Sequence, residues 1–401
     1  MLIFYTLPFV LFLLHILSYF YWLYNGSLDY VFFGSLIKYP YSDQIIKETY
    51  AFNFMIFLSY LLGLFLAKLL YKKKKNKTIT MPSLSLSLSL SLKERLFSRI
   101  LLFFLYSYII INFSTFFSSW GNYANINKIK ESYNFIFEFR VLINIFFLYI
   151  ILNHIKLSMH LKILTLFYFF SICVLQARSI IFEFLFIIAI PFLITKKINL
   201  KIFLFLCITP FIPNLIVAFR FVNTYSITEI INYLFSFEYL TLFNLIVSEA
   251  ILKYSDMHEF LLGSSYSNSI ALVIPSFIRD IFDISVDSNI EIDAVRYSAG
   301  VHGGGFSLIG ELFMNFGYYS VIFVFLYSII MNSFLYRIVW KYSSYMKISL
   351  IECIVPLILI MTILSLRNDT SPLIKYTIQL LLISGFIMLL INYCRFYSRK
   401  V

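Results

Sequence analysis

Seven side chains next to long apolar segments are candidates for chemistry in this chain. Four are arginines, one is a histidine and two are carboxylates: Arg178, Arg220, Arg296, Arg367, His302, Glu311 and Asp369. An arginine presents a planar fork that binds phosphate oxygens bidentately and keeps its charge. A histidine or a carboxylate that reaches a hydroxyl group acts as a general base. An arginine cluster beside lipid would suit a lipid-linked pyrophosphate.

Each of these residues also has a structural interpretation. Arg178 lies in a short hairpin and Arg220 ends an apolar segment, and at both places a long cationic side chain can snorkel to lipid headgroups. Glu311 is one turn into the next apolar segment, where the alternative to function is an ion pair. Arg367 and Asp369 share one short loop and can pair with each other. The sequence leaves both interpretations open.

Other chemical motifs are weak or absent. His302 begins the run His-Gly-Gly-Gly, which imitates an esterase oxyanion loop, but the chain has no G-x-S-x-G nucleophile elbow. Arg140 and Glu138 are two residues apart and do not face each other on a helix. His154 and His160 lie in a basic segment with no carboxylate or cysteine ligand pattern. We therefore expect neither a metal nor a cofactor.

The composition excludes most soluble classes. The chain has 401 residues, of which 61% are hydrophobic and 13% are charged, and its mean hydropathy is +0.86. A soluble domain carries about 25% charged residues, so a soluble enzyme, a disordered chain and a nucleic-acid-binding module are excluded. The net charge of +12 fits an excess of lysine and arginine on the cytoplasmic side of a membrane. We predict an all-α polytopic membrane protein.

The apolar segments predict about ten transmembrane helices, within a range of nine to twelve. One of them, 306–336, is long enough for a span plus an interfacial turn, and the first is read as a retained anchor. The predicted spans cover residues 2–24, 51–71, 99–118, 135–153, 162–176, 179–195, 202–219, 306–336, 348–366 and 373–393.

Charge predicts the orientation. With the N-terminus inside, the basic connections 72–98, 154–161, 196–201 and 337–347 all fall on the cytoplasmic side, as does the C-terminus. Ten of the 20 acidic residues lie between Glu229 and Asp293, on the opposite side. The chain therefore divides into three parts. These are a bundle of about seven spans (1–219), a large external loop (220–305) and a bundle of about three spans (306–401).

The external loop is expected to be structured. Residues Thr228–Leu252 and Asn268–Phe282 read as amphipathic helices that lie on or dip into the membrane face. Six of the twelve glycines fall between Gly300 and Gly317, which indicates close backbone approach just before the chain re-enters the membrane. The Ser-Leu repeats at 83–92 read as a low-complexity linker.

Three short motifs resemble the bacterial O-antigen polymerases, the Wzy family. Gly263-Ser264-Ser265-Tyr266, followed by Ile274-Pro275-Ser276, resembles the family's G-x-S-Y and I-P passage. The run from Gly303 to Tyr318 resembles its glycine-rich E-x-x-x-N-F-G signature at the head of a span. Ala177-Arg178-Ser179 is similar to its S-R-G hairpin, with serine in place of the usual glycine.

The resemblance implies a glycosyltransferase of the bacterial inner membrane, with its active site facing the periplasm. Such enzymes transfer the growing polysaccharide from undecaprenyl pyrophosphate to the non-reducing end of a new lipid-linked repeat unit, so no nucleotide sugar is needed. Its partners would be membrane lipids, a chain-length regulator and a flippase, and no nucleic acid. Arg220, Arg178, Arg296 and Arg367 would stabilise the departing pyrophosphate, and Glu311, His302 or Asp369 would be the base.

Two other functions stay open. A ligase that moves finished polymer to lipid A–core shares the topology and has a loop histidine, so His302 is consistent with that function. A lipid-linked oligosaccharide flippase is the non-enzyme alternative, but transporters are built from similar halves and short loops. This chain has one dominant loop, and the passage from Glu311 to Gly317 favours the polymerase.

The role of Arg220 can be tested by substitution. We expect Arg220→Lys to fail nearly as badly as Arg220→Ala in supporting polymer formation, because an ammonium group cannot replace a bidentate guanidinium. The readout is the length of the polysaccharide ladder on a lipopolysaccharide gel. Full activity of the lysine variant would indicate that Arg220 only snorkels to headgroups.

Overall fold

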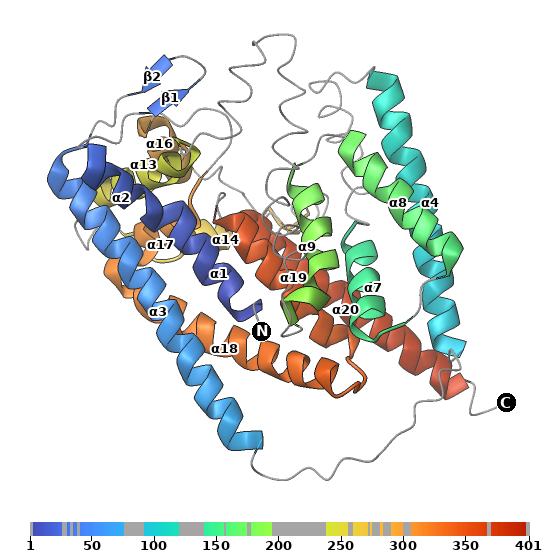
Figure 1. Cartoon of the computed structure of the whole chain (residues 1–401). Coiled ribbons are helices and arrows are strands. Elements are labelled where there is room, and N and C mark those ends of the chain that lie inside the picture. The colour runs from blue at the N-terminus through green and yellow to red at the C-terminus, as the bar shows by residue number, and fades with distance from the viewer. Residues whose placement is uncertain are drawn as a thin grey trace. The chain divides into compact units, whose positions relative to one another are not determined.

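The structure is a computed structural model, and its described residues are helical apart from turns and one short two-stranded hairpin (Figure 1). Among the described residues, three helices are long and apolar enough to cross a membrane: Asp43–Tyr71, Leu101–Ser118 and Leu308–Ser343. The helical class is thus confirmed for the described residues, and the length and composition of these three helices indicate a membrane-embedded protein. The described residues are 3–25, 30–32, 35–37, 41–75, 92–119, 140–155, 158–174, 178–194, 238–255, 260–271, 273–274, 281–283, 290–299, 306–366 and 370–397.

Nine of the ten predicted spans overlap described helical segments, residues 135–139 of the span 135–153 lie outside the described residues, and so does the whole of 202–219. The number of spans and their sidedness stay predictions. The helices are α1 (Ile3–Leu11), the π-helix η1 (Phe12–Ile16), α2 (Leu17–Asn25), α3 (Asp43–Lys75), α4 (Leu92–Ser119), α7 (Arg140–Leu152), α8 (Met159–Val174), α9 (Arg178–Ile194), α17 (Leu308–Phe316), the 3-10 turn η3 (Gly317–Tyr319), α18 (Ser320–Ser343), α19 (Leu350–Ser365) and α20 (Ser371–Tyr397).

The chain forms two compact units, each assembled from separate stretches of sequence. The first contains Met1–Leu70, Ile227–Tyr336 and Ile358–Gln379. The second contains Tyr71–Ser226, Arg337–Leu357 and Leu380–Val401. The predicted division into 1–219, 220–305 and 306–401 follows membrane segments along the sequence and stays a prediction.

In the first unit, α3 turns its polar residues inward. Thr49 shares a hydrogen bond with Ser248 (2.8 Å), and the Asn53 amide donates to the side chain of Asn244 (2.9 Å). Further along the helix, the Ser328 hydroxyl donates to the backbone carbonyl of Tyr60. Each of these contacts thus joins α3 to a residue that is distant in the sequence.

The opposite face of α3 is apolar and exposed. Phe54, Leu58, Leu62 and Phe65 are each at least 41% exposed, whereas the inward-facing Phe52 and Ile56 are buried. A soluble protein rarely exposes so long a run of large apolar side chains. A helix that is polar inside and apolar outside is what a lipid environment favours, because lipid cannot hydrogen-bond to the side chains that face it.

The N-terminal helical segment changes its hydrogen-bonding pattern at η1. In a π-helix the backbone bonds to the fifth residue along instead of the fourth, and Leu17 N–H accordingly donates to Phe12 O. The carbonyl of His15, within this segment, accepts a hydrogen bond from the Asn53 amide (3.2 Å). Asn53 therefore joins the N-terminal segment, α3 and α13 through one side chain.

The helix α13 (Glu238–Lys253) differs from the prediction for the external loop. Its described side chains from Asn244 to Ile251 are buried except for Glu249, which accepts a hydrogen bond from Tyr41 (2.7 Å). These side chains, including the polar Asn244 and Ser248, are buried on all sides of the helix, so this part of α13 lies in an interior and the interpretation as a membrane-surface helix is wrong for it. Of the second predicted helix of the loop, 268–282, residues 268–271 belong to α14 (Ser264–Ala271), and residues 272 and 275–280 lie outside the described residues.

Two elements of the first unit were not predicted. A short helix, α16 (Ile290–Ser298), buries Ile292 and Val295 and packs against α13. The strands β1 (Tyr30–Phe32) and β2 (Ser35–Ile37) form an antiparallel hairpin, in register between Tyr30 and Ile37.

In the second unit, α4 and α8 lie side by side (Figure 1). The Asn112 amide of α4 donates to the hydroxyl of Ser171 on α8 (2.9 Å), and the rings of Tyr108 and Tyr168 pack nearby. The helix α7 packs against both α4 and α9, and its side chains from Val141 to Tyr149 are buried except for Leu142.

The helices α3 and α18 approach each other closely at Gly63. A Cβ atom there would lie 2.6 Å from the Ser328 Cβ and 2.7 Å from the Phe325 carbonyl oxygen. We expect Gly63→Ala to lower the free energy of unfolding by about 2 kcal/mol through overpacking. Thermal unfolding of the detergent-solubilised protein measures the effect.

Gly385→Ala in α20 is the matched control, because a Cβ there would meet nothing within 4 Å. Its stability should be unchanged or raised by up to about 1 kcal/mol through helix propensity. Equal destabilisation by the two substitutions would contradict a tight crossing at Gly63.

Candidate functional site

The carboxylate of Glu311 is fully buried and joins three segments of the first unit. Its Oε1 accepts hydrogen bonds from the Ser265 hydroxyl (2.7 Å) and the Thr370 hydroxyl (2.6 Å). Its Oε2 accepts from the backbone N–H of Thr370 (2.6 Å). Glu311 has 0% exposure, and these three hydrogen-bond donors compensate the free-energy cost of removing its carboxylate from water.

Asn315, one turn after Glu311, extends this network. Its amide nitrogen donates to the Ser265 hydroxyl (2.9 Å) and to the Glu311 carbonyl (2.8 Å). Its amide oxygen accepts from the backbone N–H of Gly263 (2.9 Å). A further contact joins Ser269 to Ser371 (2.8 Å). We call Glu311, Asn315, Ser265 and Thr370 the carboxylate cluster.

The local structure of α17 positions this cluster. Ser307 caps the helix, and its hydroxyl accepts a hydrogen bond from the Gly310 N–H. Gly310 lets α17 pack closely on α13, because a Cβ there would lie 3.0 Å from the Ile246 Cγ2. The helix ends at Gly317, whose φ of +53° favours glycine. The predicted span 306–336 is therefore interrupted at this point, where η3 leads into α18.

Tyr266 lies beside the cluster, near Glu311 and Asn315. The phenol oxygen is buried and has no well-formed hydrogen bond among the described residues. Burial, and next the charge of Glu311, raise the pKa of the Tyr266 phenol far above its ordinary value, while the Asn315 side chain opposes the shift. The phenol is therefore protonated at neutral pH and can donate a hydrogen bond.

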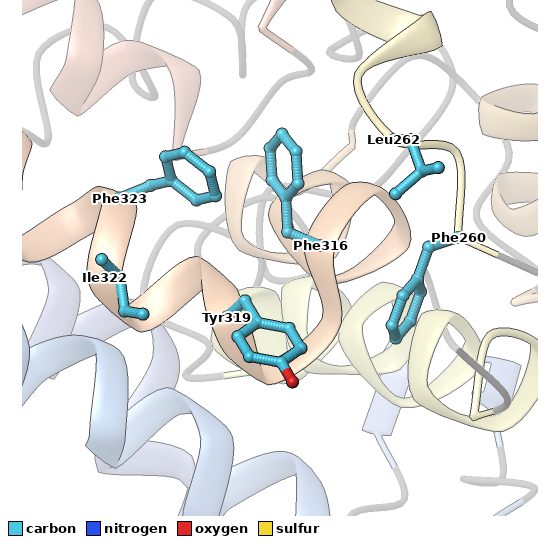
Figure 2. A pocket seen from close by; sticks show the side chains of 6 residues that line it. All are labelled: Phe260, Leu262, Phe316, Tyr319, Ile322 and Phe323. Carbon is cyan, nitrogen blue, oxygen red and sulfur yellow. The ribbon is translucent and has the colours of Figure 1, made fainter. Parts of the chain in front are cut away.

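An apolar groove adjoins these residues. It has a volume of about 470 Å³ and is lined by Phe260, Leu262, Phe316, Tyr319, Ile322 and Phe323. Figure 2 shows Phe316 at its centre, with Phe323 on one side and Leu262 and Phe260 on the other. The volume lies within the range of small-molecule binding sites.

Two of the predicted arginines lie on described elements. Arg296, on α16, forms an ion pair with Asp293 (2.7 Å), and its guanidinium lies over the Tyr297 ring. Part of its charge is thus already compensated by a local partner. Arg178 is the first residue of α9, in the second unit.

The remaining candidates lie outside the described residues: His302, Arg220, Arg367 and Asp369. Asp369 immediately precedes Thr370 in the sequence, and Arg367 is three residues before it. The predicted roles of all seven candidates stay predictions. For Glu311, the hydrogen bonds favour a positioning role, because both carboxylate oxygens already accept donors from within the chain.

No family model, no curated protein and no solved structure matches the chain.

Two paired carboxylates of the second unit were missed. The first is Glu183 of α9, which is buried and pairs with Arg140 of α7 (3.5 Å). An acidic residue inside an apolar span is costly unless it is paired, so its position in the predicted span 179–195 was an available signal. The pairing gives Arg140 a structural partner that Glu138 could not have supplied.

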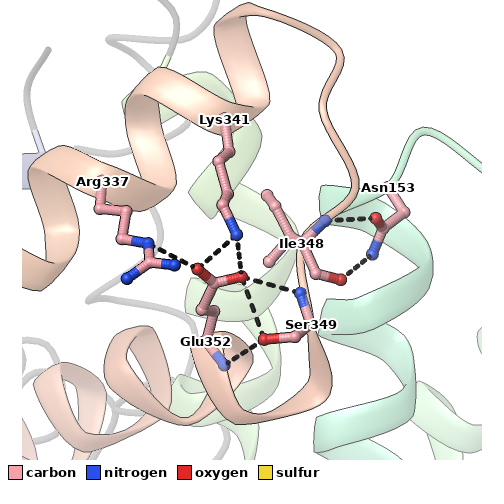
Figure 3. Close-up of polar contacts among 6 residues, drawn as sticks. All are labelled: Asn153, Arg337, Lys341, Ile348, Ser349 and Glu352. Atoms are coloured by element: carbon pink, nitrogen blue, oxygen red, sulfur yellow. Dashed lines mark hydrogen bonds and ion pairs between the residues drawn. The ribbon is translucent and has the colours of Figure 1, made fainter. Parts of the chain in front are cut away.

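The second missed carboxylate is Glu352, near the start of α19. Its oxygens accept hydrogen bonds from Lys341 (2.6 and 2.8 Å) and form an ion pair with Arg337 (3.1 Å) (Figure 3). Beside it, the Asn153 side chain exchanges two hydrogen bonds with the backbone of Ile348. These contacts hold the turn at 344–349 in place. The described residues contain no group of three or more His, Cys, Asp or Glu side chains that could bind a metal ion.

The importance of the carboxylate cluster can be measured as stability. We expect Glu311→Ala to lower the free energy of unfolding by about 3 kcal/mol, because it leaves the buried N–H of Thr370 and two hydroxyls without their acceptor. Glu311→Gln keeps the shape and one acceptor oxygen, so it should cost about 1 kcal/mol. Chemical denaturation of the purified protein provides both values.

Asp293→Ala is the control for removing an acidic residue. Its ion pair with Arg296 is partly exposed, so the change should be within about 0.5 kcal/mol. A loss as large as that of Glu311→Ala would argue against a special role for the carboxylate cluster.

Proposed function

We propose that this chain is a membrane-embedded O-antigen polymerase, which transfers a growing polysaccharide from undecaprenyl pyrophosphate to a new lipid-linked repeat unit. The observation that carries the proposal is the carboxylate cluster. It joins Gly263–Tyr266 and Glu311–Asn315, two of the segments that resemble the polymerase family, to Thr370. The two segments and Thr370 are far apart in the sequence, and Thr370 directly follows the loop that contains Arg367 and Asp369.

The reaction would be a substitution at the anomeric carbon of the donor sugar. The acceptor hydroxyl oxygen forms the new bond to that carbon, and the bond from the carbon to the pyrophosphate oxygen breaks. The acceptor proton goes to a general base, and undecaprenyl pyrophosphate leaves with the bonding electrons. Negative charge therefore grows on the pyrophosphate while the sugar becomes oxocarbenium-like.

The candidate residues divide between these two needs. Arg178, Arg220, Arg296 and Arg367 would stabilise the leaving pyrophosphate, because fixed guanidinium groups keep their charge and bind two oxygens each. His302 and Asp369 are the better candidates for the base. Glu311 accepts three internal donors, which lowers its availability to an acceptor hydroxyl.

Glu311 would then act through Thr370. Asp369 and Arg367 are one and three residues before Thr370. The hydrogen bonds that hold Thr370 to Glu311 therefore limit the positions that these two residues can reach. Tyr266, protonated and next to the cluster, would supply a hydrogen bond to a sugar or phosphate oxygen.

Deletion of the gene in its bacterial host tests the proposal. We expect the long lipopolysaccharide ladder to disappear while a band of core plus one repeat unit survives, because units are still flipped and ligated but not joined. The gel should be paired with a count of sugars on the lipid carrier. The wild-type gene should restore the ladder, and the Arg220→Ala variant should not.

Two other outcomes would contradict the proposal. Long polymer retained on the lipid carrier, with no O-antigen on the core, would indicate a ligase. Single units trapped on the cytoplasmic face would indicate a flippase.

A further inference from the structure

A buried histidine lies in the N-terminal segment of the first unit. His15 is 1% exposed and belongs to the π-helix η1, inside the predicted span 2–24. An ionisable side chain inside a membrane span is costly and is a functional candidate by default. Single π-helical turns are also frequent at functional sites. Two independent features therefore single out a residue that belongs to no sequence motif.

Different polar groups hold the backbone and the ring of His15. The Asn53 amide donates to the His15 carbonyl (3.2 Å) and to the side-chain oxygen of Asn244 (2.9 Å), which brings Asn244 close to His15. The His15 ring interacts with the Asn244 side chain and with the backbone carbonyl of Leu366. The side chains of His15, Asn53 and Asn244 are at most 2% exposed, so the ring depends on groups of the protein for its hydrogen bonds.

Leu366 is the residue at which α19 ends and the link to α20 begins. Its N–H donates to the Thr362 carbonyl (3.1 Å) in the helical pattern, and its side chain is 2% exposed. The last carbonyls of a helix have no partner within the helix and need another donor. A ring N–H of His15 can supply that donor to the Leu366 carbonyl. His15 therefore holds the first end of the α19–α20 link.

Glu311 holds the second end of the same link. The N–H and the hydroxyl of Thr370 donate to the two carboxylate oxygens of Glu311 (2.6 Å each), and the Thr370 carbonyl accepts from Ile374 N–H in the first turn of α20 (2.9 Å). Leu366 and Thr370 are four residues apart, so their Cα atoms are at most about 15 Å apart. Fixing both ends of so short a link restricts the conformations open to the residues between them.

We propose that His15 is a positioning residue, which holds the α19–α20 link at Leu366 while Glu311 holds it at Thr370. The two anchors together limit the positions from which Arg367 and Asp369 can act. This role in catalysis rests on the proposed function, whereas the anchoring of the link does not. The N-terminal segment is then more than a membrane anchor, because it reaches the candidate site through the His15 ring.

Hydrogen–deuterium exchange of the full-length protein in detergent tests the anchoring. His15→Leu removes both ring nitrogens and keeps an apolar side chain at the site. We expect amide exchange in peptides that cover residues 366–371 to rise about tenfold, because the link loses one of its two anchors and opens more often. Glu311→Gln, which weakens the other anchor, should raise exchange in the same peptides.

Thr49→Val is the matched control. Thr49 is 0% exposed and shares a hydrogen bond with Ser248 (2.8 Å), so it belongs to the same interface of α3 with α13 but bonds away from the end of α19. Its substitution should leave exchange at residues 366–371 unchanged. Thermal unfolding verifies that the variants are folded and compares their stabilities.

Two conservative variants test the hydrogen bond itself. His15→Asn and His15→Gln each carry an amide N–H, which lies near the place of one or the other ring nitrogen. The Leu366 carbonyl faces one side of the ring, so one of the two variants should keep the wild-type exchange at residues 366–371 and the other should raise it. Equal exchange in both variants would contradict a hydrogen bond from the ring to Leu366, and this comparison does not need His15→Leu to fold.

Polymer formation in vesicles supplied with lipid-linked repeat units is a separate readout. We expect His15→Leu to lower kcat per folded protein about tenfold and to change KM by less than about twofold, because the positioned groups act in the transition state. Thr49→Val should keep both values. A wild-type kcat in His15→Leu would overturn the role in catalysis.

The outcomes separate the anchor from the proposed function. Unchanged exchange in folded His15→Leu, or an equal rise in Thr49→Val, would overturn the anchor whatever the activity of the protein. Exchange needs no turnover, so a raised exchange in His15→Leu together with a wild-type protein that forms no polymer would uphold the anchor and reject the polymerase.

Discussion

The buried carboxylate of Glu311 needs internal partners, and much of the first unit is arranged to supply them. A carboxylate with no exposure cannot stay charged without donors. The donors come from Ser265 and Thr370, which are 46 and 59 residues away in the sequence. The short helix α14, the start of α17 and the segment before α20 must therefore meet at one point. The turn at Gly317 and the groove next to it follow from how α17 ends.

The same requirement recurs in the second unit. Glu183 is paired with Arg140, and Glu352 is held by Arg337 and Lys341. These pairs connect helices, so each acidic residue also fixes the position of its neighbours. Apolar side chains, which contribute most of the composition, are free to face lipid. Polar contacts inside and apolar surface outside thus describe both units.

The sequence predicts helices well here because a long run of apolar residues has few stable structures other than a helix. It predicted α3, α4 and α18 from that signal, and it placed Glu311 among the residues that matter. It was wrong about α13, because apolar composition alone does not distinguish a helix on a membrane face from an enclosed one. It also missed the partners of Glu311, since Ser265 and Thr370 are ordinary residues whose importance depends on contacts across the fold. The sequence indicated Tyr266 only as part of a motif. The burial of its hydroxyl follows from the packing of the fold and could not be predicted.

The inward polar face of α3 has a consequence for biosynthesis. Thr49 finds its partner Ser248 only 199 residues later in the chain, and the Tyr60 carbonyl meets Ser328 after 268 residues. At a synthesis rate of about 5–20 residues per second, these partners emerge about 10–50 seconds after α3 has left the ribosome. During this interval the polar edge of α3 faces either lipid or the insertion machinery. Until then Thr49 has only its bond to the Ile45 carbonyl within the helix, so the contacts of α3 with α13 and α18 form only after most of the chain has been made.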